Sequence, residues 1–185
     1  MRSFAAALAL VLSLGVAGCA SDEPQPGTLD PLPSASPSAV GASPIPVPSA
    51  ALSADAFGAS AFARHYLALV DAAFEAGDPS AVIAVSDPGC GGCNSFIDGI
   101  RQDSPEGERY EGGTFDVRFA EAPPVADGDV VVDLQYVVTE LKVYGPDGAL
   151  LRTKPATAPT LAQMRLNRRG SGWVVRGFRN VEAAS

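Results

Sequence analysis

Residues 130–144 read VVVDLQYVVTELKVY, and this stretch decides the fold. From Val132 to Val138 every second side chain is large and apolar, which is the period of a β-strand with one buried face. Leu141 and Val143 then fall on the opposite parity, so a regular strand would turn them away from that face. We therefore expect one long strand with a bulge or a strong bend near Thr139-Glu140.

Other segments with a period of two surround this strand. Residues 114–122 alternate in the same way and predict a strand with one solvated side. Residues 161–167 and 173–178 flank a Gly-rich turn at 169–172 and predict a closing hairpin. Between the long strand and this hairpin, a turn at 146–148 leads into a stretch that we expect to be irregular.

Three helices are expected before the strands. The first begins with Ser53 as N-cap, has Leu52 placed to pack on Phe57 as a hydrophobic staple, and ends at Gly77. A short helix follows at about residues 79–85, and a third at about 93–101. Helices followed by antiparallel strands predict an α+β fold in which the helices pack on one face of a curved antiparallel sheet.

The order and spacing of these elements resemble nuclear transport factor 2 and its relatives, which have a cone-shaped (cystatin-like) α+β fold. The resemblance covers residues 53–181 and is carried by Phe74-Glu75-Ala76-Gly77-Asp78 at the end of the first helix. The closing strands, with Met164-Arg165-Leu166 and Trp173-Val174-Val175, complete it. It implies two to three helices covering a bent sheet, with a pocket inside the cone.

The N-terminus predicts export. Residues 1–18 contain one basic residue, Arg2, and a short apolar run that ends in small residues, as in a secretory signal peptide. Val16-Ala17-Gly18-Cys19 resembles the bacterial lipobox, which implies that Cys19 is lipidated and becomes the new N-terminus. We expect a lipoprotein on the outer face of the cytoplasmic membrane; the alternative is an ordinary signal peptide with an incidental cysteine.

Residues 19–51 form the predicted tether. Proline, serine and alanine dominate this segment, which disfavours both helix and sheet. In polyproline II form, at about 3.1 Å per residue, it would reach roughly 100 Å. A Pro-rich docking ligand is the alternative. The globular domain is then expected at residues 52–182.

Cys90-Gly91-Gly92-Cys93 is the strongest local motif of the domain. Outside the cytoplasm two such thiols are expected to form a disulfide, which would fix the start of the third helix. A thiol-disulfide exchanger is the alternative, because a helix N-terminus stabilises a thiolate. With the lipobox and tether, Asp87-Pro88-Gly89 before this motif resembles a lipoprotein family of high-GC Gram-positive bacteria whose function is not known.

Few residues suggest catalysis. His65 and Tyr66 on the first helix and Tyr136 on the long strand are the candidates to line a pocket in the cone. Enzymes among the relatives of this fold, such as ketosteroid isomerase-like proteins, use an Asp and a Tyr there, but no motif matches them here. We therefore assign no catalytic residue, no metal site and no cofactor.

Composition and charge exclude some classes of binding partner. The chain has 185 residues and a net charge of −8, which argues against nucleic-acid binding. One His and three Cys are too few for a zinc-ribbon framework. The closing hairpin is nevertheless basic, and Arg165, Arg168, Arg169 and Arg176 form a candidate face for an anionic partner. Internal pairing with acidic loops is the alternative.

These features predict a membrane-anchored, extracytoplasmic module that binds a small molecule, a protein or an anionic envelope component. The alternative is an extracytoplasmic enzyme, through thiol-disulfide exchange at Cys90 and Cys93 or through small-molecule chemistry in the cone.

Overall fold

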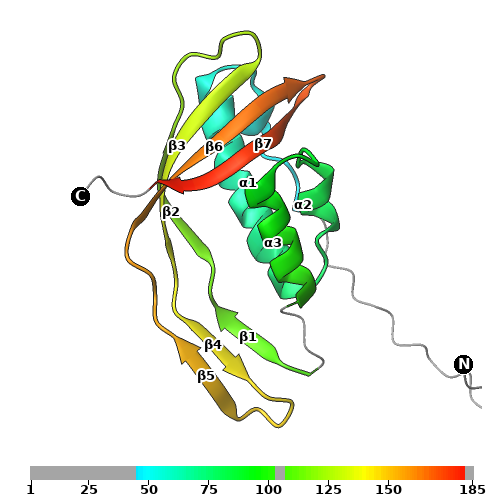
Figure 1. The fold of residues 1–185 in the computed structure, drawn as a ribbon, viewed down its shortest axis with the longest axis vertical. Helices are drawn as coiled ribbons and strands as arrows, with labels where there is room; N and C mark the ends of the chain where they lie inside the picture. The colour runs from blue at the N-terminus through cyan, green and yellow to red at the C-terminus, as the bar shows by residue number, and fades with distance from the viewer. Residues whose placement is uncertain (1–44, 103–106, 182–185) are drawn as a thin grey trace, which may run out of the picture. The chain divides into compact units, whose positions relative to one another are not determined.

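The computed structural model describes residues 45–102 and 107–181. The predicted leader, Cys19 and the tether up to residue 44 lie outside the described residues. None of the described helices is long and apolar enough to cross a membrane. The bounds of the helices and strands (Figure 1) are η1 Ser49–Leu52, α1 Ala56–Ala76, α2 Ser80–Ala84, α3 Gly91–Gln102, β1 Arg109–Gly112, β2 Phe115–Glu121, β3 Asp129–Val138, β4 Leu141–Tyr144, β5 Leu150–Lys154, β6 Thr160–Arg169 and β7 Gly172–Val181.

The first helix keeps its predicted end but not its predicted start. Asp55 is the N-cap, and its carboxylate accepts the backbone N–H of Gly58 at 2.8 Å. Ser53 is therefore not the cap, and the staple is wrong because Leu52 and Phe57 are 50% and 69% exposed. Gly77 ends the helix as predicted, in the left-handed region with φ 65°.

Order begins before residue 52. The 3-10 helix η1 packs on α1, and all of it except Leu52 lies in the segment predicted as tether. Ala51 is 1% exposed and belongs to the core. The Pro-rich composition conceals this contact, because the residues that make it are small and few.

All strands pair in antiparallel fashion, in two sheets. The four-stranded sheet has the order β2-β3-β6-β7 and the three-stranded sheet has the order β1-β4-β5. The single long strand predicted at 130–144 is thus two strands, β3 and β4, separated at the predicted bend Thr139-Glu140. The predicted hairpin is longer than expected, and β1 and β5 are strands that the sequence did not predict.

Two glycines make the matching bend on the neighbouring chain segment. Gly112 and Gly113 have φ of 76° and 75°, a backbone conformation that favours glycine. A Cβ atom at Gly112 would overlap the carbonyl oxygen of Glu140, and the Gly113 N–H donates to that oxygen at 3.1 Å. The corner between the two sheets therefore requires the close approach of two backbones, which a side chain at Gly112 would prevent.

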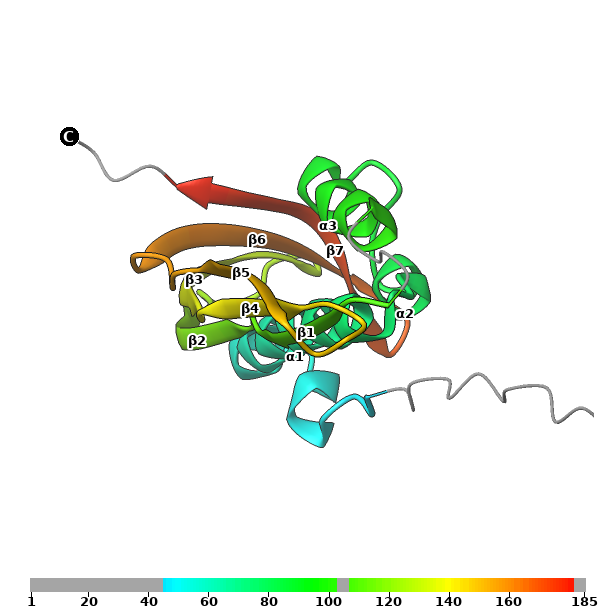
Figure 2. The ribbon, with the colours of Figure 1, turned by 90° about the horizontal axis from the view of Figure 1, so that it is seen from below.

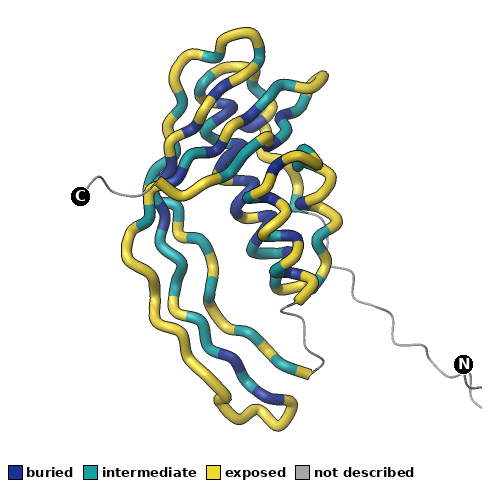
Figure 3. The backbone as a smooth tube through the Cα atoms, viewed as in Figure 1, coloured by how far each residue is buried: buried dark blue, intermediate teal, exposed yellow. Residues whose placement is uncertain are grey.

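The core lies between α1 and the four-stranded sheet, which curves around this helix (Figure 2). Helix α1 contributes Phe62, Tyr66 and Val70 at a spacing of four residues, and β3 contributes Val132 and Leu134 from alternate positions. Buried positions concentrate there, whereas the three-stranded sheet is mostly exposed (Figure 3). Each fully buried large side chain contributes about 1.5–3 kcal/mol, so this layer dominates stability.

Helix α3 packs against β7 and begins two residues earlier than predicted. Ile97 and Ile100, which are 7% and 0% exposed, form its buried face. With three helices covering a curved antiparallel sheet, the fold is α+β, as predicted from the sequence.

Candidate functional site

The three residues predicted to line a pocket are part of the core instead. Tyr66 is fully buried, and its hydroxyl lies 3.1 Å from Ser86 Oγ. The Tyr136 hydroxyl donates to Asn180 Oδ1 at 2.8 Å. His65 is 4% exposed, and burial lowers its pKa below 6.5. None of the three lines any of the cavities described below.

A cavity lined by both polar and apolar side chains lies where the two sheets meet the end of α1. It has a volume of about 640 Å³. We call it the corner cavity, and its wall includes Asp71, Phe74, Glu75, Tyr110, Val138, Thr139, Leu141, Lys154, Pro155 and Thr157. Its wall also includes Gly112 and Gly113, so the bend between the sheets shapes it.

Asp71 is the half-buried acid of this wall. The Phe115 N–H points at both of its carboxylate oxygens, at 3.1 Å from Oδ1 and 3.2 Å from Oδ2. Burial raises the pKa of Asp71 to about 6, although the Phe115 N–H acts in the opposite direction. Seven residues earlier on α1, Arg64 Nη1 donates to the Val117 carbonyl at 2.8 Å.

Arg64 and Asp71 thereby pair with the outer edge of β2. Among the described strands β2 pairs only with β3, so its other edge would leave backbone groups unpaired. The two side chains satisfy one carbonyl and one N–H of that edge. Asp71 therefore has a structural role besides its place in the cavity wall.

Hydrogen bonds between distant segments fix the rest of the wall. Thr139 Oγ1 accepts the Thr114 N–H at 3.0 Å, and Thr157 Oγ1 accepts the N–H of the last β3 residue at 3.0 Å. Arg152 Nη2 donates to Glu108 Oε2 at 3.3 Å across the three-stranded sheet. The cavity is consequently preformed.

Sequence reasoning missed this site. Its residues come from α1, β1, the β3–β4 corner and the segment after β5, and no local motif links them. The one signal available was Asp71, an acid that directly follows the buried Val70 in an otherwise apolar part of the helix.

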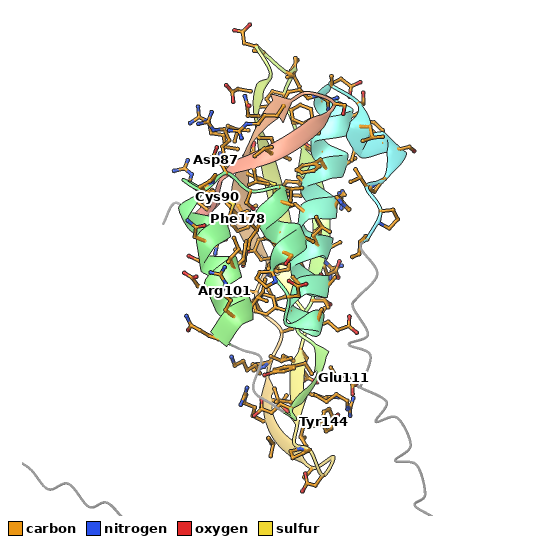
Figure 4. The ribbon with its side chains drawn as sticks, turned by 90° about the vertical axis from the view of Figure 1, so that its right-hand side faces the viewer. Asp87, Cys90, Arg101, Glu111, Tyr144 and Phe178 are labelled. Atoms are coloured by element: carbon orange, nitrogen blue, oxygen red, sulfur yellow. A yellow bond between two sulfur atoms is a disulfide. The ribbon has the colours of Figure 1, made fainter. Side chains whose placement is uncertain are left out.

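Cys90 and Cys93 form the predicted disulfide, with their Cα atoms 5.2 Å apart. Both are 0% exposed. A Cβ atom on Gly92 would overlap the Phe178 carbonyl, so the loop lies directly on β7; Figure 4 shows Cys90 and Phe178 close together where α3 begins. Exchange requires a thiolate to reach a sulfur atom, and burial opposes that approach.

The four predicted anion-binding arginines do not act as one group. Arg169 Nη2 lies 2.9 Å from Asp87 Oδ2, and Arg176 Nε lies 3.8 Å from it. Arg168 donates to two backbone carbonyls that precede α1, at 2.9 and 3.3 Å. Arg165 and Arg176 line a separate groove of about 670 Å³ on the outer face of the sheet. The internal pairing with acidic loops, predicted as the alternative, thus describes Arg169, whereas Arg176 both approaches Asp87 and lines the groove.

Comparisons with known proteins add little. No protein-family model and no curated protein matches the sequence. Aln2 from a Streptomyces species is 15% identical, with a TM-score of 0.40 over 64% of this chain and 82% of its own. The intermembrane space region of chloroplast protein ARC6 is 12% identical, with a TM-score of 0.43 over 67% and 97% of the two chains. A variant of Rd1NTF2_05 is 10% identical, with a TM-score of 0.35 over 65% and 96%. Similarities this low carry no argument about what the chain does.

Proposed function

We propose that this protein is a lipid-anchored, extracytoplasmic binding module that holds a small ligand in the corner cavity. The observation that carries this proposal is the cavity itself. Ligand sites in proteins usually measure about 300–1,000 Å³ and combine apolar walls with a few convergent polar groups. At about 640 Å³, with Phe74 and Leu141 beside Asp71 and Thr139, the corner cavity has these properties.

Binding fits the cavity better than catalysis does, because several of its polar groups already hold the fold together. Thr139 and Thr157 accept backbone N–H groups, and Asp71 accepts the Phe115 N–H. A wall that is already hydrogen-bonded needs little ordering when a ligand enters, which lowers the entropic cost of association. The lipobox at Cys19 supports the anchoring half of the proposal.

The binding half is tested by filling the cavity. Leu141→Trp places a large ring in it, whereas Leu151→Trp adds the same ring to β5, where Leu151 is 54% exposed. A compound library is screened by thermal shift on the chain without its leader and with Cys19→Ala. We expect compounds that raise the melting temperature of the wild type and of Leu151→Trp but not of Leu141→Trp.

A second filling variant guards against a folding defect. Pro155→Trp enters the cavity from the exposed segment after β5, away from the core. Compounds that stabilise the wild type and both filling variants equally would contradict the proposal.

The anchoring half is tested in cells. The full chain is expected in the membrane fraction, with lipid attached at Cys19, and Cys19→Ala is expected in the soluble extracytoplasmic fraction. Equal distribution of the two chains, with no lipid on the wild type, would contradict anchoring.

Thiol-disulfide exchange is the second candidate, because the disulfide stands at the N-terminus of α3. The Cys93 N–H points at Cys90 Sγ at 3.2 Å, as expected where a helix start could stabilise a thiolate. The burial of both cysteines favours the structural role. The two roles differ in reduction potential, which gives the test described in the Discussion.

A further inference from the structure

The two acidic side chains that α1 contributes to the corner cavity form no ion pair with a described cation. Asp71 and Glu75 both line it and stand one turn apart on α1, a spacing at which like charges repel. Among residues 45–102 and 107–181, the carboxylate of Asp71 receives only the Phe115 N–H, whereas a carboxylate offers about four acceptor positions. Asp71 therefore retains unused acceptor capacity in a wall that is partly withdrawn from water.

The two cations that line the cavity are Arg109 and Lys154, and neither forms an ion pair with Asp71 among the described residues. Arg109 lies over the Tyr144 ring, 4.3 Å from its centroid, and its Nη1 is 3.8 Å from Glu111. Arg152, which pairs with Glu108, does not line the cavity. Lys154 lines the cavity from β5. Among the described residues, none of the ion pairs reaches Asp71.

The remaining wall is apolar. Phe74 from α1, Tyr110 from β1, and Val138 and Leu141 from either side of the bend present aromatic and aliphatic surface. A ligand that fills this space gains about 25 cal/mol for each Å² of apolar surface removed from water. Such a ligand needs an apolar body of about the size of one aromatic ring or more, and one donor group directed at Asp71.

We propose that the corner cavity selects ligands that carry a protonated amine on an apolar body, and that Asp71 receives the ammonium group. This inference rests on the proposed function. A charge-assisted hydrogen bond is about twice as strong as a neutral one, and a cation also relieves the repulsion between Asp71 and Glu75. Asp71 is thus the residue that determines specificity.

The experiment compares three probes of the same shape: 2-phenylethylamine, 2-phenylethanol and phenylacetate. Each is titrated into the ¹⁵N-labelled chain lacking the leader and carrying Cys19→Ala, and the amide shifts of Phe115, Thr139 and Leu141 are followed. We expect the amine to bind at least about tenfold more tightly than the alcohol, and the acid to bind least.

Two variants assign the preference. Asp71→Asn keeps an acceptor for the Phe115 N–H but removes the charge, and should abolish the preference for the amine over the alcohol. Asp98→Asn, at an exposed position on α3 outside the cavity, is the matched control and should keep it. Because burial holds the pKa of Asp71 at about 6, affinity for the amine should rise between pH 5 and 7, with Glu75, Glu108, Arg109 and Lys154 as the other charged groups of the wall.

The outcomes separate the two proposals. If the alcohol binds as tightly as the amine, or the acid binds most tightly, the inference about Asp71 is wrong while the cavity remains a binding site. If Asp71→Asn leaves the preference for the amine unchanged, Asp71 is not its source. If none of the three probes moves these amides at millimolar concentration, the inference about Asp71 is wrong, and the thermal-shift screen with the filling variants decides the binding function separately.

Discussion

Replacing Asp71 by Asn should change how stability depends on pH. Burial raises the carboxyl pKa from 3.8 to about 6, a rise of about two units, and each unit corresponds to about 1.4 kcal/mol. The upper limit is thus about 3 kcal/mol, and partial solvation of the cavity wall reduces it to about 1–2 kcal/mol. Because the native pKa is raised, the stabilisation linked to this proton is fully present below pH 4 and is lost as pH rises through 6.

The amide of Asn cannot ionise and still accepts the Phe115 N–H, so the variant should escape this loss. Urea denaturation at pH 4 and pH 7 gives the free energy of unfolding of both proteins. The difference between Asp71→Asn and wild type should shift in favour of the variant by about 1–2 kcal/mol from pH 4 to pH 7. A difference that is the same at both pH values, with exposed Asp98→Asn as control, would refute the reasoning.

Three further predictions concern other parts of the domain. Replacing the fully buried Cys90 and Cys93 together by Ala should cost about 2 kcal/mol of unfolding free energy, the entropy of a very short loop. The native pair should have a reduction potential below about −300 mV in glutathione or dithiothreitol buffers, and a value between about −120 and −200 mV would favour exchange. Arg168→Ala should cost about 1 kcal/mol in urea denaturation, because the Leu52 carbonyl loses its side-chain donor while the Ser53 carbonyl keeps the one from Trp173 Nε1. Exposed Arg165→Ala should change stability by less than about 0.5 kcal/mol, and equal losses would contradict the role of Arg168. His65→Leu should be neutral or about 1 kcal/mol stabilising at pH 7, since the buried Nε2 has no hydrogen-bond partner among the described residues. The advantage of the variant should widen at pH 5, because burial lowers the pKa of His65 and the wild type therefore loses stability as pH falls; the same difference at both pH values would argue against this.

The period-two strands and the long first helix followed from the sequence because a buried face imposes a repeat on the chain. The change of parity after Val138 was a reliable sign of the bend, since no regular strand can bury both Tyr136 and Val143 on one side. The helix end at Gly77 could also be predicted, because the left-handed backbone conformation that ends a helix favours glycine.

The strands β1 and β5 could not be predicted in the same way. All five residues of Leu150–Lys154 are exposed, so no alternation marks them, and their extended form depends on pairing with β4. His65 was predicted as a candidate to line a pocket, but its side chain is buried, with the Phe62 ring beside it on α1 at 6.2 Å between ring centroids. Tertiary packing decides both cases, and local patterns do not contain it.

The corner cavity could not be predicted from local sequence patterns either. Asp71 and Leu141 both line it although many residues separate them in the chain, and only the folded corner brings them to one wall. The sequence suggested a pocket inside the cone lined by His65, Tyr66 and Tyr136, but those side chains fill the core that the pocket would have needed.

The Gly112-Gly113 corner has a consequence for finding related proteins. Any chain that builds the same cavity must place a residue without a side chain opposite the carbonyl at which its long strand breaks. A search that scores sequence identity over the whole chain gives these two glycine positions no special weight. A search for two adjacent glycines ahead of an aromatic strand, combined with a strand whose apolar parity switches at the matching position, would detect the shared geometry even where the remaining sequence has diverged.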